Sequence, residues 1–580
     1  MTTIHSGNGL DPRPHERSAN TYPWLKHYPA DVDYFQTFTP EPLPSVLDRT
    51  VARFGARPAT GFLGKTLTYA ELGAETNRAA KGLQGIGVRK GSHIGLLLPN
   101  CPAYIVYYYA ILKAGGTVVN FNPLYTAEEL SHQARDAEID TLVTLDLKAT
   151  FDKARALLQA GTIKRIIVVP FKDMLPGVKG VLFRLLKSRD VADWKGAGTS
   201  AQILPSPQLL ANDGKFAPVH IDVEDVAVLQ YTGGTTGIPK GAMLTHTNLS
   251  VNVQQIDAWF SEAQDGAEKF LCVIPFFHVF AMTGLMNYAI AKAAHKVMLP
   301  RFELVPTLKI ISREKPTVMA GVPTLYNALM NAPTIKNYDL SSLKYCISGG
   351  APLPLEVKRG FERIAGCTLV EGYGLSETSP VTNINPVKGP VKDGSIGFPV
   401  PGTIISLREL GAPENEVPLG EKGEICIKGP QVMKGYWKKP QETADTFVGE
   451  YFRTGDVAYM DEDGFTYIVD RVKDLILCSG FNVYPRRIEE AIYEHPAVQE
   501  VTVIGIPDEY RGEAPKAYIK LKPGNAATAA DIMTFLKTKL SKIELPAQIE
   551  FRDELPKTLI GKLSKKELKA EVKAQMQQKA

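Results

Sequence analysis

The sequence predicts an α/β protein: a large N-terminal domain with parallel or mixed sheets covered by helices, followed by a small α+β domain. Two observations favour the large domain. Short apolar segments alternate with helical segments between residues 93 and 169, as expected for parallel strands joined by helices. The chain has 580 residues, of which 44% are hydrophobic, enough for a large core. A third observation favours the small domain, because the strand and helix patterns become shorter after residue 470.

The apolar patterns place the elements in order along the chain. In the first part they predict strands at 93–98, 117–121, 140–145 and 164–169, and helices at 102–114, 127–137 and 150–160. A buried strand at 226–231 then leads into a glycine-rich loop. In the last part they predict strands at 475–478, 501–506, 516–521 and 548–551, and helices at 485–494 and 529–540.

Composition excludes several classes of protein. The net charge of +4 is too small over this length to indicate nucleic-acid binding. Six scattered cysteines form no C-x-x-C pair, which argues against structural zinc and disulfides and fits a reducing cytosol. The N-terminus is polar, so we expect no signal peptide. The longest apolar run, 104–112, is too short to span a membrane. We therefore expect a soluble cytoplasmic protein.

The loop from Tyr231 to Gly241 predicts phosphate binding. Its glycines let the backbone approach an anion, and its threonine hydroxyls and backbone N–H groups suit phosphate oxygens. Lys240 adds positive charge. The spacing is not that of a Walker A loop, and Pro239 opposes the helix that would follow one. The candidate phosphate-binding residues are Thr232, Gly233, Gly234, Thr235, Thr236, Gly237 and Lys240.

Four further motifs follow in order, and with the loop they point to a family. They occupy residues 371–378 (EGYGLSET), 451–456 (YFRTGD), 470–474 (DRVKD) and 556–562 (PKTLIGK). The set resembles the adenylate-forming superfamily of acyl- and aryl-CoA synthetases, luciferases and peptide-synthetase adenylation domains. The resemblance extends from about residue 66 to 566. Residues 470–485 and 26–35 are most similar to bacterial long-chain fatty acid–CoA ligases.

The resemblance implies a domain organisation. Residues 1–470 would form an AMP- and acyl-binding domain that includes a β-rich subdomain. Residues 471–473 would form a hinge, and residues 474–580 a mobile lid domain. The small domain would rotate about Lys473 between two half-reactions, which is a lid motion. A homodimer is also compatible with the family.

The resemblance further implies ATP, Mg²⁺ and coenzyme A as cofactors or cosubstrates. Attack on the α-phosphorus with loss of pyrophosphate depends mainly on orientation and charge neutralisation. Mg²⁺ takes one or two carboxylates besides phosphate oxygens, and Glu377 with Thr232 would serve it. Asp456, helped by Arg471, would accept the ribose hydroxyls. The adenine pocket and its flanking motif would comprise Gly349, Gly350, Ala351, Pro352, Glu371, Gly372, Tyr373, Gly374 and Ser376.

Lys562 is the candidate catalytic lysine for the first half-reaction. An ammonium is favoured where negative charge develops between carboxylate and α-phosphate. Several neighbouring lysines make a solvated basic stretch the alternative, but Gly561 and the Pro-Lys-Thr sequence before it match the family loop. After rotation, the lid would present Gly480, Phe481 and Asn482 to coenzyme A. Leu477 stands where some relatives carry lysine.

The expected acyl site lies at 271–300. This segment contains no Asp or Glu, so a cationic amino-acid substrate would lack a counter-charge. Its apolar residues favour a hydrocarbon channel, with core helix as the alternative, and the small Gly284 leaves room. His278 resembles the family's gate between acyl pocket and CoA tunnel. The apolar candidates are Phe276, Phe277, Val279, Phe280, Met282, Leu285 and Met286.

A second segment indicates lipid contact. Residues 171–189 space apolar side chains at helical intervals and interleave five basic residues. Basic amphipathic helices bind anionic membrane surfaces, although Pro176 and Gly177 disturb the first turn and a helix packed on the protein is the alternative. We therefore expect peripheral contact with the inner face of the membrane.

Three functions remain open on the sequence alone. The first is a long-chain fatty acid–CoA ligase. The second is a medium-chain or aryl acid–CoA ligase, or an acyl-AMP ligase that loads a carrier protein, since the same ATP motifs serve all of these. The third is a non-catalytic lipid- or nucleotide-binding relative. Retention of Lys240, Glu377, Asp456 and Lys562 together argues against the third.

Overall fold

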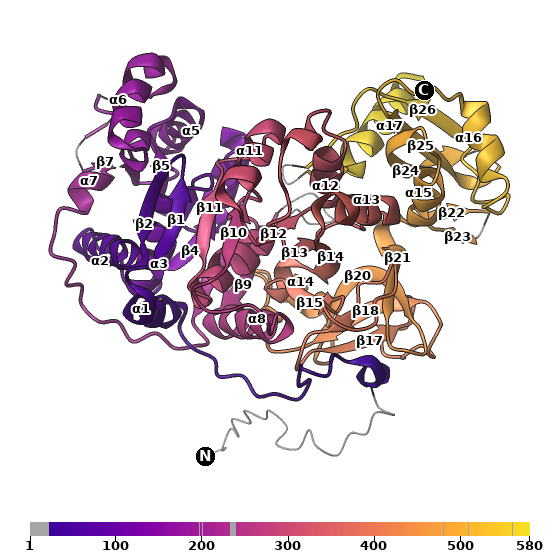
Figure 1. The fold of residues 1–580 in the computed structure, drawn as a ribbon, viewed down its shortest axis with the longest axis horizontal. Coiled ribbons are helices and arrows are strands. Elements are labelled where there is room, and N and C mark those ends of the chain that lie inside the picture. The colour runs from indigo at the N-terminus through magenta and orange to yellow at the C-terminus, as the bar shows by residue number, and fades with distance from the viewer. Residues whose placement is uncertain are drawn as a thin grey trace.

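The structure is a computed structural model that describes residues 22–196, 198–199, 201–232, 239–479, 481–508, 510–558 and 561–579. Within these residues the strands form four sheets. Two large sheets lie side by side with helices around them, an antiparallel sheet lies below, and the C-terminal sheet lies at the upper right of Figure 1. The mixed α/β class expected from the sequence is confirmed.

The first large sheet has seven strands in the order β7-β6-β5-β3-β4-β8-β9, parallel except for β9. Its members are β3 (His93–Leu97), β4 (Thr117–Asn120), β5 (Thr141–Leu145), β6 (Arg165–Val169), β7 (Ile203–Pro205), β8 (Val226–Thr232) and β9 (Lys240–Thr245). The strands predicted between 93 and 169 are all present, each within one residue of the expected bounds.

The second large sheet has nine strands in the order β16-β15-β14-β13-β12-β10-β11-β1-β2. Its central strands from β14 to β1 are parallel, and antiparallel strands close both edges. The strands are β1 (Pro58–Phe62), β2 (Lys65–Thr68), β10 (Lys269–Cys272), β11 (His295–Met298), β12 (Val318–Gly321), β13 (Tyr345–Ser348), β14 (Thr368–Gly374), β15 (Val381–Ile384) and β16 (Phe398–Pro399).

Two smaller sheets complete the fold. The antiparallel β-rich sheet contains β17 (Ile404–Arg408), β18 (Gly423–Lys428), β19 (Phe447–Val448), β20 (Tyr451–Met460) and β21 (Thr466–Arg471). The C-terminal sheet contains β22 (Ile476–Cys478), β23 (Phe481–Val483), β24 (Val498–Asp508), β25 (Gly512–Leu521) and β26 (Gln548–Phe551). A separate apolar cluster around Ile488, Val501 and Ile532 forms the core of the C-terminal region.

Helices pack against the sheets (Figure 1). They are α1 (Leu43–Phe54), α2 (Tyr69–Gly85), α3 (Pro102–Lys113), α4 (Ala127–Asp136), α5 (Lys148–Gln159), α6 (Gly177–Leu186), α7 (Ser206–Leu209), α8 (His246–Trp259), α9 (Val279–Ala281), α10 (Tyr288–Ala291), α11 (Leu304–Glu314), α12 (Pro323–Met330), α13 (Leu355–Ala365), α14 (Pro440–Thr446), α15 (Pro485–Tyr493), α16 (Ala529–Leu536) and α17 (Lys565–Lys579).

Helix α3 shows why the longest apolar run of the sequence is not a membrane segment. All of its residues are buried, as expected of a helix that is hydrophobic on every side. The Tyr104 hydroxyl donates to Asn120 Oδ1 at the end of β4 (2.6 Å) and to the carbonyl of Phe276 beyond β10 (3.0 Å). The helix therefore joins the two large sheets. No helix among the described residues has the length and apolar character that crossing a membrane requires.

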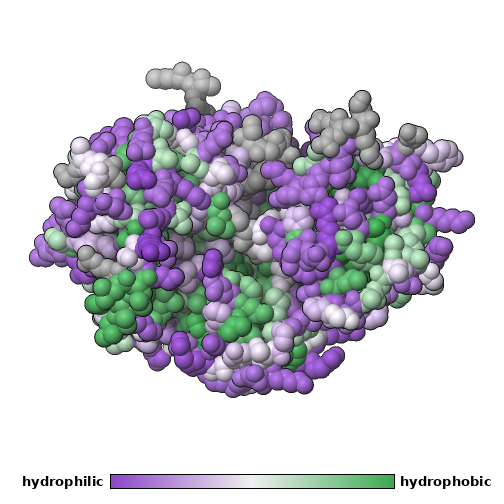
Figure 2. Space-filling view, turned by 90° about the horizontal axis from the view of Figure 1, so that it is seen from above, coloured by the Kyte–Doolittle hydropathy of each residue, from purple (hydrophilic) through white to green (hydrophobic). Residues whose placement is uncertain are grey.

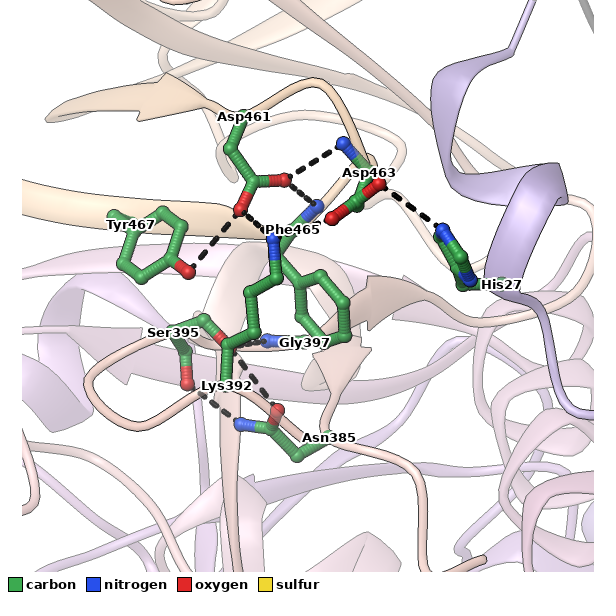
Figure 3. A network of polar contacts seen from close by, with 9 residues as sticks. All are labelled: His27, Asn385, Lys392, Ser395, Gly397, Asp461, Asp463, Phe465 and Tyr467. Carbon is green, nitrogen blue, oxygen red and sulfur yellow. Dashed lines mark hydrogen bonds and ion pairs between the residues drawn. The ribbon is translucent and has the colours of Figure 1, made fainter. Parts of the chain in front are cut away.

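The N-terminal segment is fastened to the turn between β20 and β21 (Figure 3). His27 Nε2 lies 3.0 Å from Asp463 Oδ1. Lys392 Nζ contacts both Asp463 (2.7 Å) and Asp461 (2.6 Å). Asp461 also accepts a hydrogen bond from Tyr467 (3.2 Å). This network fixes the turn of the hairpin formed by β20 and β21. Towards the other end of this hairpin lie two candidate site residues, Asp456 and Arg471.

The amphipathic segment at 171–189 differs from a single continuous helix. A short 3₁₀ turn covers Phe171–Met174, and α6 begins only at Gly177, because Pro176 ends the preceding turn. Met174 and Leu175 are buried and belong to the core. The exposed apolar face of α6 consists of Val178, Val181, Leu182, Leu185 and Leu186, at 47–77% exposure.

Candidate functional site

The candidate site lies where the two large sheets meet. The carboxyl ends of β12, β13 and β14 face the same edge of the nine-stranded sheet because these strands are parallel. The short turn Ser376–Thr378 follows β14 and contacts both β8 and β9 of the other sheet. In α/β proteins, ligands bind at the carboxyl edge of parallel strands. Most of the candidate residues lie on or next to these strands.

The predicted phosphate loop joins two antiparallel strands. Thr232 ends β8, and Lys240 begins β9 directly opposite it. A strand thus follows Pro239, in agreement with the expectation that no helix follows the loop. The candidates Gly233, Gly234, Thr235, Thr236 and Gly237 lie outside the described residues, as does Gly480 of the expected CoA loop.

Tyr436 contacts both Lys240 and Glu377, the charged candidates for phosphate and Mg²⁺ binding. Lys240 Nζ lies 5.2 Å from the centre of the Tyr436 ring, and the Tyr436 hydroxyl donates to Glu377 Oε1 (2.8 Å). Glu377 is only 9% exposed, and burial raises its pKa. A buried carboxylate with one hydrogen bond from a neutral donor retains acceptor capacity for a cation.

The residues present suit a Mg²⁺ ion that is shared with phosphates. No group of three or more His, Cys, Asp or Glu side chains that suits a metal occurs in the described part of the chain. Glu377, on the turn that contacts the ends of β8 and β9 near Thr232, offers the single hard carboxylate that Mg²⁺ needs beside phosphate oxygens and water.

Asp456 is held between two partners from different elements. Its Oδ2 accepts a hydrogen bond from Tyr373 at the end of β14 (2.6 Å), and its Oδ1 accepts one from Arg471 Nε (3.0 Å). Asp456 and Arg471 face each other across β20 and β21. Asp456 is 4% exposed. Because each carboxylate oxygen has a second lone pair, the Asp456 carboxylate can still accept hydrogen bonds from the hydroxyls of a sugar.

The expected adenine pocket consists of two adjacent strand ends. Gly349, Gly350, Ala351 and Pro352 follow β13, and the segment from Glu371 to Gly374 ends β14. A Cβ on Gly349 would lie 3.1 Å from the Phe280 ring, so glycine permits a close approach there. Burial raises the pKa of Glu371 to about 7, and Arg486 opposes this shift. Ser376 lies in the turn that follows.

Lys562 reaches this pocket from the C-terminal region. A Cβ on Gly350 would lie 2.7 Å from Lys562 Cε and 3.2 Å from its Nζ. Burial lowers the pKa of Lys562 to about 8, with Arg471 adding to the shift and Asp456 opposing it. The structure thus brings Lys562 against Gly350 of the expected adenine pocket, and the charges of Arg471 and Asp456 act on its ammonium.

His278 lies in the apolar segment that follows β10 of the nine-stranded sheet. His278 Nδ1 accepts a hydrogen bond from the backbone N–H of Phe280 (3.3 Å) at the start of α9. Burial lowers the pKa of His278 to about 3, and the charge of Lys562 contributes to this shift. The segment continues as a π-helical turn, Met282–Asn287, a distortion common at functional sites.

The apolar candidates are mostly packed within the core. Phe276, Val279, Met282, Leu285 and Met286 are at most 1% exposed. Gly284 differs, because an added Cβ would meet only Phe280 Cδ2, at 3.9 Å. Space therefore exists beside Gly284. A cavity of about 140 Å³ lies elsewhere, lined among others by Leu67, Val106 and Met174.

The remaining C-terminal candidates are exposed. Phe481 and Asn482 form β23, and Lys473 lies in the short turn after β21. Strand β23 lies at the right edge of the C-terminal sheet in Figure 1. Leu477 beside it is 57% exposed. These residues do not contribute to the pocket that contains Lys562 in this arrangement.

Sequence reasoning missed two residues. Tyr436 joins Lys240 to Glu377, and Thr324 on α12 donates to the carbonyl of Gly561 beside Lys562 (2.5 Å). Only the Gly-Tyr-Trp sequence at 435–437 could have drawn attention to Tyr436. Nothing in the local sequence indicates that Thr324 contacts residues more than 200 positions away.

Comparisons with known proteins agree with this geometry. The AMP-binding enzyme family model matches residues 47–437, and the model of the AMP-binding enzyme C-terminal domain matches 487–562. A long-chain-fatty-acid–CoA ligase of Bacillus subtilis is 44% identical over 94% of this chain and 97% of its own length. One from Escherichia coli is 37% identical over 96% and 99%. The crystal structure of the anthranilate CoA ligase AuaEII in complex with anthranoyl-AMP covers 92% of this chain and 98% of its own, with 25% identity and a TM-score of 0.80.

Proposed function

The chain belongs to the AMP-binding enzyme family, and we propose that it is an ATP-dependent long-chain fatty acid–CoA ligase. It activates the fatty acid as an acyl-adenylate with release of pyrophosphate and then transfers the acyl group to coenzyme A, which gives acyl-CoA and AMP. The observation that carries this proposal is the close approach of Lys562, from the C-terminal region, to Gly350 after β13, next to β14, whose Tyr373 bonds to Asp456.

The first half-reaction uses the strand ends and the lysine together. Asp456 and Arg471 bind the ribose, and the loops after β13 and β14 hold the base. Lys240 and the phosphate loop bind the departing pyrophosphate. Glu377 and Thr232 would hold Mg²⁺, which would supply positive charge next to the phosphates. A carboxylate oxygen of the fatty acid attacks the α-phosphorus, and Lys562 stabilises the charge that develops there.

The second half-reaction requires a different face of the C-terminal region. We assign residues 1–470 to the N-terminal domain, 471–473 to a hinge and 474–580 to the lid. Rotation about Lys473 withdraws Lys562 and brings the loop with Gly480, Phe481 and Asn482 to the pocket. The CoA thiolate attacks the acyl carbonyl, and AMP leaves. The exposure of Phe481 and Leu477, at 62% and 57%, supports a surface that meets its ligand only after rotation.

CoA-dependent AMP release across five acids tests the function: acetate, octanoate, oleate, coumarate and leucine. We expect the highest kcat/KM on oleate. A maximum on coumarate or octanoate would replace the substrate assignment, and adenylate without a CoA product would favour a carrier-protein acceptor. No activity on any acid would favour a non-catalytic binding relative. The resemblance to an anthranilate CoA ligase makes the aryl acid the second candidate.

Gly284 offers a sharper test of the acyl channel. Because its surroundings are open, Gly284→Leu adds a side chain where the hydrocarbon would extend. We expect preference to move from oleate towards octanoate, by about tenfold in the ratio of kcat/KM. Gly284→Ala is the control and should change the ratio little. An unchanged ratio in the leucine variant would place the acyl chain elsewhere.

We also propose peripheral contact of α6 with anionic membranes. The hydrophobic patch at the lower left of Figure 2 lies at the same end of the molecule as α6 in Figure 1. Its five exposed apolar side chains are accompanied by basic residues, including Lys179, Lys187 and Arg189. Apolar area combined with positive charge is the signature of a helix that lies in the membrane interface.

Sedimentation with anionic liposomes tests this contact. Replacement of Lys179, Arg184 and Lys187 by glutamate should release the protein from the liposomes. Replacement of the exposed Lys336, Lys537 and Lys542 by glutamate makes the same change of charge away from α6 and should not. Equal binding of the two variants would exclude α6 as the contact.

A further inference from the structure

Helix α12 contacts the C-terminal region through two polar side chains that lie three residues apart. The Thr324 hydroxyl donates to the carbonyl of Gly561 (2.5 Å), and Asn327 Nδ2 donates to the carbonyl of Gln499 in β24 (3.2 Å). Residues at i and i+3 share one face of a helix. The first contact reaches Gly561 in the loop that carries Lys562, which we call the lysine loop. The second contact reaches the C-terminal sheet, which contains β24.

The lysine loop approaches the large domain more closely than a side chain would allow. Gly561 has φ +86°, and a Cβ there would lie 3.0 Å from Thr324 Oγ1 and 3.3 Å from Val322 Cγ2. On the other side, Gly350 has φ +81° and leaves space for Lys562. Left-handed backbone and tight packing both favour glycine at these positions. The lysine loop and the loop of Gly350 therefore pack closely on either side of Lys562.

The lysine loop is internally braced, so a contact at Gly561 also positions Lys562. The N–H of Thr558 donates to the carbonyl of Lys562 (2.6 Å), and the N–H of Gly561 donates to the carbonyl of Thr558 (2.8 Å). Lys557 Nζ forms an ion pair with the buried Glu500 Oε1 of β24 (2.8 Å). The loop can therefore move only together with the sheet to which it is anchored.

We propose that α12 is the docking face that seats the lid for adenylate formation, with Thr324 as the positioning residue for Lys562. This inference rests on the proposed function, in which Lys562 serves the first half-reaction only. Thr324 acts through the backbone of Gly561. Because rotation about Lys473 carries the lysine loop away, both hydrogen bonds from α12 break before thioester formation. The contact thus stabilises one of two lid positions and leaves the second half-reaction alone.

Loss of the Thr324 hydroxyl should affect one half-reaction selectively. Thr324→Val keeps the shape but leaves the part-buried Gly561 carbonyl without its donor, which weakens the docked position. We expect the rate of oleoyl-adenylate formation, followed as pyrophosphate release, to fall at least about fivefold. Thioester formation from supplied oleoyl-adenylate and CoA should stay within about twofold of wild type. Asn327→Ala should show the same split to a smaller extent.

Two controls separate docking from a general structural effect. Thr324→Ser restores the hydroxyl and should recover adenylate formation. Thr334→Val makes the same chemical change at an exposed position beyond α12 and should alter neither half-reaction. Equal loss of both half-reactions in Thr324→Val, or no loss of either, would overturn the inference. Absence of adenylate formation by the wild type would instead refute the proposed function, so the two failures are distinguishable.

Discussion

The two sides of the candidate site are built in different ways. On the strand side, Asp456 accepts hydrogen bonds from Tyr373 and Arg471, and Glu377 accepts one from Tyr436. On the lid side, a single loop carries Lys562. Helix α12 donates one hydrogen bond to this loop, at the Gly561 carbonyl, and one to β24, at the Gln499 carbonyl.

This difference indicates which groups serve throughout the reaction and which serve only part of it. In the proposed mechanism, the groups that bind the nucleotide in both half-reactions lie on or next to strands, because a nucleotide remains bound from ATP to AMP. The group needed once, Lys562, is carried by a separate region that can depart. Variants on the two sides should therefore differ in which half-reaction they affect.

Lys562→Ala should have the largest and most selective effect. Removal of the ammonium takes away a charge aimed at the transition state, which typically costs about a hundredfold to a thousandfold in rate. We expect this loss in pyrophosphate release from ATP and oleate, while supplied oleoyl-adenylate still reacts with CoA. Loss of both half-reactions would contradict the assignment of the lysine to the first alone.

Asp456→Asn tests the strand side. The amide keeps the size but weakens the contact with Arg471 and with ribose hydroxyls, and hydrogen bonds to charged groups contribute about 1.5–3 kcal/mol. We expect affinity for ATP and for the acyl-adenylate to fall by about tenfold to a hundredfold, so that both half-reactions suffer. Isothermal titration with AMP measures binding without turnover. Selective loss of the first half-reaction would remove the contrast between the two sides.

The sequence was sufficient for the parts of this comparison that depend on local patterns. Alternating apolar and helical segments predicted the parallel strands from β3 to β6, and the apolar run before the glycine-rich loop predicted β8. These features depend on residues close together in the chain, where periodicity and turn chemistry are legible.

Contacts between distant segments could not be predicted in the same way. The Thr324 hydroxyl and the Gly561 carbonyl are 237 residues apart. Tyr436 reaches Glu377 over 59 residues. The division of residues 171–189 into a buried turn and an exposed helix depends on which side chains meet the core. Only the folded arrangement determines such pairings.

The pH dependence of adenylate formation should show the titration of Lys562, the reacting group on the lid side. The pKa of Lys562 is lowered to about 8, so the ammonium is present below pH 8 and is lost as the pH rises above it. We expect kcat/KM for adenylate formation to fall about tenfold per pH unit above pH 8. Lys562→Arg remains charged throughout and should not show this decline, although its maximal rate is lower. An identical decline in both proteins would assign the titration to another group.

Tyr373→Phe should have the smallest effect, because Asp456 keeps its second partner. The variant removes the hydrogen bond to Oδ2 and leaves the one from Arg471 to Oδ1. A net loss of about 1 kcal/mol corresponds to roughly fivefold weaker AMP binding, spread over both half-reactions. Thr324→Val also removes one hydroxyl donor, but on the lid side, and should affect adenylate formation alone. If Tyr373→Phe were as selective as Thr324→Val, selectivity would not follow from the side of the site on which a residue lies.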